Sequence, residues 1–273
     1  MGFIFVPIFA LMFTNPPRTK FNASPKYQPI LRELGIDAEA IFDHPEIVVW
    51  RSIRERQNCT LDADLADGRH IRLHITRHIP ERGTRTPADE EALGIRALEI
   101  EGIPTVPLVG WGKLVDGRSF IITEDLTDYR DAEKAVREGL PFDSILESTA
   151  DAAAKLHGAG LHHRDLYLCH FFVKYNDPAD VRLIDAARVT RLPGWPMRQR
   201  WIVKDLAQFW YSTKSLAITD DQRMRWLSRY GEKRNLESID RLRGAIERKS
   251  AWIARHDARL RQKQKDRNVS IPE

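Results

Sequence analysis

The side chains best suited to chemistry lie in the run His163-Arg164-Asp165 and in the residues just after it. His170 stands five positions after Asp165, and Asp185 stands about twenty positions after it. Phosphoryl transfer requires a carboxylate that orients the acceptor hydroxyl, a further metal ligand, and a second acid that carries the ion bridging the nucleotide phosphates. Asp165, His170 and Asp185 match these roles in this order and at the spacing typical of kinases. The sequence therefore predicts phosphotransfer, with Asp165 as the base and with His170 and Asp185 at the metal.

The same run contains two further loop residues and has one competing interpretation. We assign His163 and Arg164 to the catalytic loop, where His163 is expected to support the loop and Arg164 to pair with a carboxylate. Imidazole and thiol groups also gather here, and such donors bind zinc. The loop explains the intervening residues better, but zinc stays an alternative for these side chains, which are His157, His162, His163, Cys169 and His170.

The residues before this loop are expected to form a small antiparallel sheet with one helix. Asp67-Gly68 and Asp116-Gly117 are typical hairpin turns between strand-like segments. The run Thr86-Pro87-Ala88-Asp89 provides an N-cap, a first-turn proline and a capping acid for a helix that Gly102 ends. The predicted strands cover residues 47–50, 59–65, 72–78, 108–111 and 119–124.

The second half is predicted to be mostly helical. A helix over residues 146–157 precedes the catalytic loop, short strands at 171–173 and 181–184 follow it, and helices continue from about Val203. The fold class is therefore α+β with two lobes. The predicted domains are an N-terminal extension (1–40), a nucleotide-binding N-lobe (41–124) and a C-lobe (125–273) that contains the catalytic loop and basic C-terminal helices.

Three segments resemble the bacterial lipopolysaccharide core kinase family, the Kdo and heptose kinases. They are the run from His163 to Phe171, Ile-Asp-Ala-Ala-Arg at 184–188, and Arg-Trp-Ile-Val-Lys-Asp-Leu-Ala at 200–207. The resemblance extends from about Ile47 to Tyr230, and His170, where protein kinases have asparagine, is similar to the family's own pattern. The resemblance implies a protein-kinase-like fold. It also implies an enzyme that uses ATP and Mg²⁺ to phosphorylate a sugar hydroxyl of a lipid-linked saccharide.

Thr76 is the main departure from the family's pattern. Glu91 shares a helical face with Ile95 and Leu98, so it points toward the core, and a buried carboxylate needs a partner. In kinase-like folds this partner is a lysine on the third strand, and the resemblance would place a Lys-Arg pair where Thr76-Arg77 stands. Because alternate strand residues point to opposite faces, Arg77 cannot replace the lysine without a bulge.

A substitute cation would have to come from another position. The loop over residues 51–60 contains no glycine, and its Arg54 and Arg56 could hold phosphates or could be an exposed charged turn. We assign Arg54, Arg56, Glu91 and Thr76 to nucleotide binding, with Arg72 and His74 as further cations on the strand face of Thr76. Without a substitute the chain would be a pseudokinase, and an aminoglycoside-type small-molecule kinase is a third interpretation.

The acceptor is not expected to be a protein. Fewer than 20 residues separate Asp185 from Lys204-Asp205, which leaves little room for the segment that holds a peptide in protein kinases. Asp205 opens an apolar helical run, and we expect it to brace the catalytic loop. A lipid-linked saccharide or a small sugar is the expected acceptor.

Composition and charge indicate the cellular location of the protein and the kind of partner that it binds. Two cysteines in 273 residues favour a reducing, cytoplasmic location. The net charge of +4 suits an acidic partner, and after Ile239 a basic amphipathic helix is predicted that either packs on the C-lobe or contacts an anionic surface at the inner membrane. Nucleic acid is disfavoured because aromatic residues are not interleaved with the charges. The apolar residues 3–13 lack a basic flank and contain Pro7, so we expect a segment that packs on the body rather than a signal or anchor.

Overall fold

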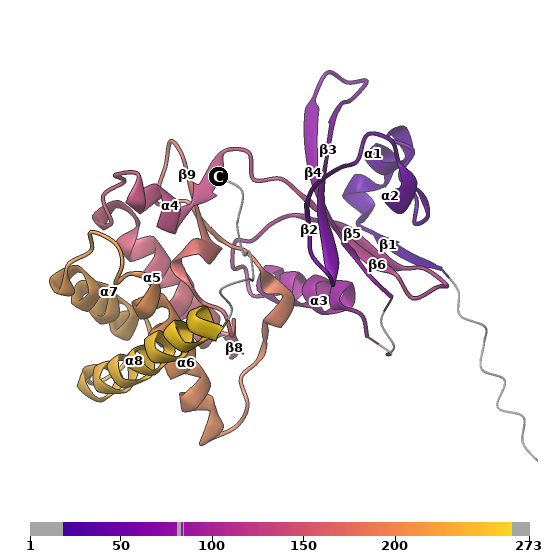
Figure 1. The fold of residues 1–273 in the computed structure, drawn as a ribbon. Coiled ribbons are helices and arrows are strands. Elements are labelled where there is room, and N and C mark those ends of the chain that lie inside the picture. The colour runs from indigo at the N-terminus through magenta and orange to yellow at the C-terminus, as the bar shows by residue number, and fades with distance from the viewer. Residues whose placement is uncertain (1–18, 81–82, 84, 264–273) are drawn as a thin grey trace, which may run out of the picture.

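The computed structural model describes residues 19–80, 83 and 85–263, and it has a sheet lobe and a helical lobe (Figure 1). The apolar segment at residues 3–13, which we expected to pack on the body, lies outside these described residues. The sheet has six antiparallel strands in the order β1-β5-β6-β4-β3-β2. Gly68 and Gly117 turn two of its hairpins at φ of 81° and 93°, a region that favours glycine. The strands are β1 (Lys20–Ala23), β2 (Val48–Ser52), β3 (Arg56–Asp64), β4 (His70–His78), β5 (Leu108–Lys113) and β6 (Ser119–Glu124).

Helix α3 (Pro87–Ile100) covers one face of this sheet. Its first turn has the predicted capping box. The hydroxyl of Thr86 accepts from the amide of Asp89, and the carboxylate of Asp89 accepts from the amide of Thr86. The buried side of α3, which includes Ile95 and Leu98, packs against Trp111 of β5 and Ile121 of β6. This helix is the one that places Glu91 next to the helical lobe.

The other face of the sheet is covered by residues assigned to the N-terminal extension. Strand β1 pairs with β5 at the edge of the sheet, and η1 (Pro25–Tyr27), α1 (Gln28–Glu33) and α2 (Ala40–Asp43) follow it. Side chains from the extension, such as Leu31 and Ile36, form a second core with Leu73, Ile75 and Phe120 of the sheet. In this structure residues 19–40 are therefore packed as part of the sheet lobe.

The helical lobe surrounds the catalytic loop. Helix α6 begins at Met197, earlier than the predicted start near Val203. The prediction missed this part of the helix because its first turn is exposed and shows no apolar periodicity. Phe209 of α6 stacks on Trp226 of α7 with ring centroids 4.0 Å apart. The helices are α4 (Ala132–Arg137), α5 (Asp143–Gly158), α6 (Met197–Ser212), α7 (Asp220–Lys233) and α8 (Asp240–Lys263).

Short strands and single turns connect these helices around the loop. Strands β10 (Val181–Leu183), β9 (Phe171–Lys174) and β7 (Tyr129–Asp131) form a three-stranded sheet, and β11 (Thr190–Arg191) pairs with β8 (Leu161–His162). The catalytic loop lies between β8 and β9, with η2 (Leu168–His170) at its end, and η3 (Ala186–Arg188) follows Asp185.

Gly94 brings α3 against the helical lobe. A Cβ atom at this position would lie 1.9 Å from the backbone oxygen of Ala186, so a larger residue would push α3 away from η3. Because η3 directly follows Asp185, this contact fixes Glu91 close to Asp185. Among the described helices, none is both long and apolar enough to cross a membrane.

Candidate active site between the lobes

Asp205 braces the catalytic loop through the loop's backbone. The side chain is buried on α6, its Oδ2 accepts from the amide of His163 at 2.7 Å, and its Oδ1 accepts from the amide of Arg164 at 2.9 Å. Burial alone would raise the pKa of Asp205, but the hydrogen bond from His157 and those from the loop amides outweigh it and lower the pKa. The bracing role expected for Asp205 is confirmed by these contacts. Arg164 has a φ of 72°, so the loop turns sharply at the residue before Asp165.

The side chains of His163 and Arg164 act at the two ends of this turn. Nε2 of His163 donates to the carbonyl of Ile184 at 2.9 Å, and burial lowers the pKa of this imidazole, so the neutral ring links the loop to the residue before Asp185. The guanidinium of Arg164 lies over the ring of Trp201, 5.0 Å from its centroid. Within the described residues Arg164 forms no ion pair, so the predicted carboxylate pairing is wrong for its side chain. The left-handed turn directs that side chain toward α6, where an indole face is available.

Asp165 is oriented by two donors from outside the loop. Nη1 of Arg188 lies 2.8 Å from Oδ2, and Nε2 of Gln208 donates to Oδ1 at 3.2 Å. Lys204 donates from Nζ to the carbonyl of Arg164 and fixes the adjoining peptide. A carboxylate held in this way is partly exposed and has a fixed orientation, as a group that orients an acceptor hydroxyl requires.

His170 and Asp185 present a pair of metal-binding atoms. Nδ1 of His170 donates to the carbonyl of Asp165 at 2.6 Å, so Nε2 keeps its lone pair, and it lies 3.6 Å from Oδ2 of Asp185. The two atoms are near enough for both to reach one ion after a small approach, and Asp185 supplies the oxygen ligand that Mg²⁺ prefers. In the part of the chain that the structure describes, no three His, Cys, Asp or Glu side chains converge on a common point. The remaining ligands would then be phosphate oxygens and water, as is usual for Mg²⁺ at nucleotide sites.

The side chains considered for zinc serve separate contacts. His157 is buried against Tyr230, with 2.8 Å between Nδ1 and the hydroxyl, and against Asp205. His163 is hydrogen-bonded to the carbonyl of Ile184, and His162 packs against Trp201 with ring centroids 4.8 Å apart. Their ring nitrogens point to different neighbours, so the donor set does not fit a zinc ion.

Glu91 and Asp185 form a pair of like charges with Arg56 as the nearby cation. Burial is the main cause that raises the pKa of Glu91 to about 7, the carboxylate of Asp185 raises it further, and the charge of Arg56 opposes both. Arg56 pairs with His78 across β3 and β4, and Asn58 pairs with Thr76, so Arg56 and Thr76 share the sheet face that α3 covers. The Nε of Arg56 is buried and has no hydrogen-bond partner among the described residues.

The other candidate cations do not act on Glu91. Arg77 is buried on the opposite face over the ring of Phe42, as strand alternation predicts. His74 contacts Asp125, which directly follows β6, with Nε2 and Oδ1 2.6 Å apart. The Nε of Arg72 lies 3.9 Å from the other oxygen of the same carboxylate, and Arg54 is exposed in the turn between β2 and β3. Arg56 is therefore the residue among these candidates that can replace the missing lysine.

Three residues of the site were missed by sequence reasoning. Arg188 stands in the 184–188 segment that carries the family resemblance, but nothing local to it indicated that it reaches Asp165. Gln208 lies on the buried face of α6, where a polar residue among apolar ones is the available signal. Gly94 is a glycine inside a helix, which indicates close packing.

Comparison with known proteins agrees with this geometry. The model of the lipopolysaccharide kinase (Kdo/WaaP) family matches residues 67–230. The chain belongs to this family. The lipopolysaccharide core heptose(I) kinase WaaP of Pseudomonas aeruginosa is 28% identical over 240 residues, which cover 78% of this chain and 85% of that protein. WaaP of Escherichia coli K12 is 32% identical over 163 residues, and the match spans 52% of this chain and 59% of that protein.

Solved structures confirm the kinase-like fold. A structure of WaaP in complex with acyl carrier protein aligns with a TM-score of 0.64 at 27% identity and covers 85% of this chain and 98% of that one. An aminoglycoside-3'-phosphotransferase of type VIII aligns with a TM-score of 0.53 at 15% identity, over 75% of this chain and 93% of that one, and this match shows the fold alone. The chain is thus a phosphotransferase of the kinase class, with the two-lobed α+β fold predicted from the sequence.

Proposed function

We propose that this kinase transfers a phosphoryl group from ATP to a sugar hydroxyl of a lipid-linked saccharide of the lipopolysaccharide core type. The observation that carries the proposal is the oriented group of Asp165, His170 and Asp185 on a loop that Asp205 braces. The named relatives act on lipopolysaccharide core heptose, and the family model supports the same class of acceptor.

Each residue of the site has a role that follows from its contacts. Asp165 orients the acceptor hydroxyl and takes its proton, and Gln208 and Arg188 hold the carboxylate in place. His170 and Asp185 would hold Mg²⁺, which neutralises phosphate charge when bound. Arg56 would contact the nucleotide phosphates in place of the absent lysine, because it lies on the α3 side of the sheet and its charge acts on Glu91.

A pseudokinase is the second candidate, and Thr76 is the observation that favours it. Without a lysine between them, Glu91 and Asp185 repel each other, and Arg188 already pairs with Asp165. A chain in this state would bind a partner or a nucleotide without turnover. The two candidates differ in whether Arg56 restores phosphate contact.

Labelled ATP and an extract of lipid-linked core saccharide would distinguish them. The wild-type chain is expected to label the saccharide, and Arg56→Gln should reduce turnover by roughly 10²–10³, the usual cost of losing one charged transition-state contact. Thr76→Lys should change turnover little if Arg56 already substitutes. Arg54→Gln, in the exposed turn of the same hairpin, is the matched control and should leave turnover near wild type.

The pseudokinase interpretation predicts a different pattern. Wild type would then show no labelling with any saccharide acceptor, and Thr76→Lys would create nucleotide binding or weak phosphotransfer. A wild type that neither binds nor hydrolyses ATP would refute the proposed kinase activity.

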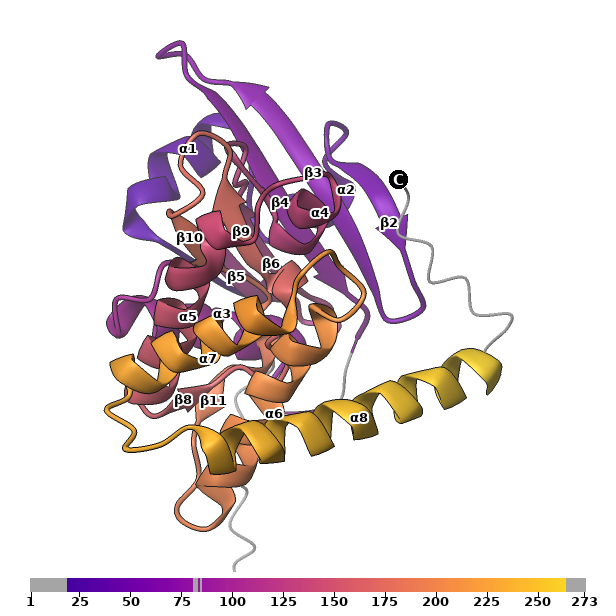
Figure 2. The same ribbon diagram turned by 90° about the vertical axis from the view of Figure 1, so that its left-hand side faces the viewer.

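A lipid-linked acceptor would bring the chain to an anionic membrane surface. The first half of α8 packs on α6, whereas Arg255 and Arg259 in its second half are exposed, and Figure 2 shows this end extending past the other helices. Such a basic helix end is suited to peripheral contact with acidic headgroups. We propose a cytoplasmic enzyme that meets its acceptor at the inner membrane.

A further inference from the structure

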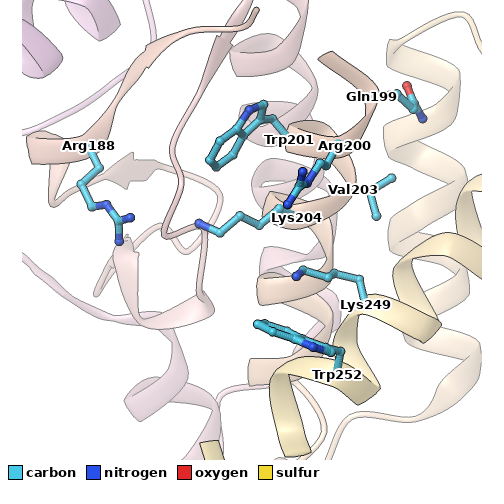
Figure 3. Close-up of a pocket in the computed structure, with 8 residues that line it drawn as sticks. All are labelled: Arg188, Gln199, Arg200, Trp201, Val203, Lys204, Lys249 and Trp252. Atoms are coloured by element: carbon cyan, nitrogen blue, oxygen red, sulfur yellow. The ribbon is translucent and has the colours of Figure 1, made fainter. Parts of the chain in front are cut away.

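A pocket of about 400 Å³ lies between α6 and α8, beside the catalytic loop. Figure 3 shows that its walls are formed by basic side chains and two indole rings. The residues that matter are Arg188, Arg200, Trp201, Lys204, Lys249 and Trp252. Its composition differs from that of an ordinary solvated surface, in which charges of both signs are interspersed.

The pocket carries positive charge that the protein neutralises only in part, through the ion pair of Arg188 with Asp165. No carboxylate occurs among its lining residues, and within the described chain Arg200 and Lys249 take part in no ion pair. Burial and the nearby charge of Arg200 both lower the pKa of Lys249, which shows that the two cations lie in each other's field. A group of like charges in a concave, partly desolvated site attracts an anion.

The indole rings of Trp201 and Trp252 give the pocket a second preference, for a ligand with apolar surface. Trp252 is 49% exposed, and Nζ of Lys249 lies 3.7 Å from the centroid of its ring. Trp201 lies under Nζ of Lys204 at 5.5 Å. The ring of Trp252 also stacks on His256, with ring centroids 5.2 Å apart, so the apolar area that it offers is the exposed remainder of the indole beside Lys249. Such an area next to a cation suits a ring with an apolar face and charged or hydroxylated edges. A sugar with a fixed negative charge has both properties.

The pocket is continuous with the catalytic loop. Arg188 lines the pocket and also contacts Oδ2 of Asp165 at 2.8 Å, and Lys204 lines it and donates to the carbonyl of Arg164. The side chain of Arg188 therefore connects a ligand in the pocket to the carboxylate of Asp165.

We propose that this pocket binds an anionic sugar unit of the acceptor, one that bears a phosphate or a carboxylate, through Lys249, Arg200 and the indole of Trp252. The inference rests on the proposed function and deepens it, because it assigns the acceptor a charge and a binding position. Arg188 then links the bound anion to Asp165, so that occupancy of the pocket and alignment of the base are coupled.

Direct binding tests the pocket without any need for turnover. Glucose 6-phosphate, glucuronate, glucose and inorganic phosphate are titrated into the full chain by ligand-observed NMR, which detects millimolar affinities. At least one of the two anionic sugars should bind about tenfold more tightly than both glucose and phosphate, and the tighter of the two identifies the anion. The proposal would be overturned if neither anionic sugar binds more tightly than both glucose and phosphate.

Variants locate the binding. Lys249→Gln should weaken binding of the anionic sugar by about tenfold, the cost of one charge-assisted contact. Trp252→Ala should weaken it by a similar factor, about tenfold, because the apolar contact of the indole is lost. Arg248→Gln removes the same charge from the adjacent, exposed position of α8 and is the matched control, which should bind like wild type. Melting temperatures confirm that each variant is folded. Wild-type affinity in both Lys249→Gln and Trp252→Ala would refute the assignment.

Kinetics separates this inference from the proposed function. With core saccharide as acceptor, Lys249→Gln should raise the KM for saccharide several-fold while the KM for ATP stays constant. An active wild type whose saccharide KM does not respond to Lys249→Gln would refute the pocket and leave the kinase intact. An inactive wild type that still binds the anionic sugar through Lys249 would refute the kinase and uphold the pocket.

Discussion

The free energy of unfolding of Glu91→Gln, compared with that of wild type, should increase as the pH rises. Burial and the nearby Asp185 raise the pKa of Glu91 from 4.5 to about 7. The folded chain therefore keeps a proton on Glu91 to higher pH than the unfolded chain does. Stability falls as the pH rises from about 4.5 to about 7, and the loss is complete above that range. Glutamine does not ionise, so the variant avoids this loss.

The magnitude follows from the same pKa. At about 1.4 kcal/mol for each tenfold change in proton affinity, the rise corresponds to roughly 3 kcal/mol at full ionisation. Local relaxation and water reduce this value, so we expect the difference in unfolding free energy between variant and wild type to grow by about 1–3 kcal/mol from pH 5 to pH 8. Other titrating groups are common to both proteins and cancel in the difference.

Urea denaturation at a series of pH values measures this difference. Glu90→Gln, at the exposed neighbouring position of α3, provides the baseline for losing one negative charge from the same turn. Mg²⁺ with nucleotide should shrink the wild-type loss, because a cation held by Asp185 would offset the negative charge that helps to raise the pKa of Glu91. A stability difference that stays flat from pH 5 to pH 8, or that moves in favour of wild type, would refute the reasoning.

Three further predictions test the loop, the packing of α3 and the basic helix. Asp165→Ala should reduce kcat by roughly 10²–10⁴ with nucleotide binding retained, whereas Asp185→Ala should also weaken Mg²⁺-dependent nucleotide binding, and wild-type turnover in either variant would contradict the assignment. Gly94→Ala should destabilise by about 1–3 kcal/mol, because its Cβ would lie 1.9 Å from a backbone oxygen of η3; thermal melts check this, and the small gain normal for alanine in a helix would contradict the contact. Arg255→Gln with Arg259→Gln should leave the melting temperature nearly unchanged and weaken binding to anionic vesicles by about 1 kcal/mol per residue at low salt, so unchanged vesicle binding would show that α8 serves packing alone.

Most elements could be predicted because their signals are local. The Asp67-Gly68 and Asp116-Gly117 turns, the capping box at Thr86 and the apolar periods placed the sheet and α3 close to their observed bounds. The start of α6 was misplaced, because its first turns have no apolar face to pack. The packing of β1, α1 and α2 on the sheet had no local signal, since it depends on a strand that pairs with β5 from far along the chain.

The sequence by itself determined the order of the catalytic groups, since the steps from Asp165 to His170 and Asp185 are properties of the chain. It also determined that the lysine is absent at Thr76 and that Arg77 points to the other face. Only the tertiary structure identifies the cation that we propose as its replacement. Arg56 reaches the α3 side of the sheet through the register of β3 with β4, and its charge acts on Glu91.

The same division holds for the acceptor side. Arg188 meets Asp165, and α6 meets α8 around the basic pocket, only because helices distant in sequence pack together. Periodicity and turn residues act through neighbours within a few positions, so they specify elements and loops. Contacts between elements depend on register, crossing and close approach, such as that of Gly94 with η3, and these are set by the packing of the whole chain.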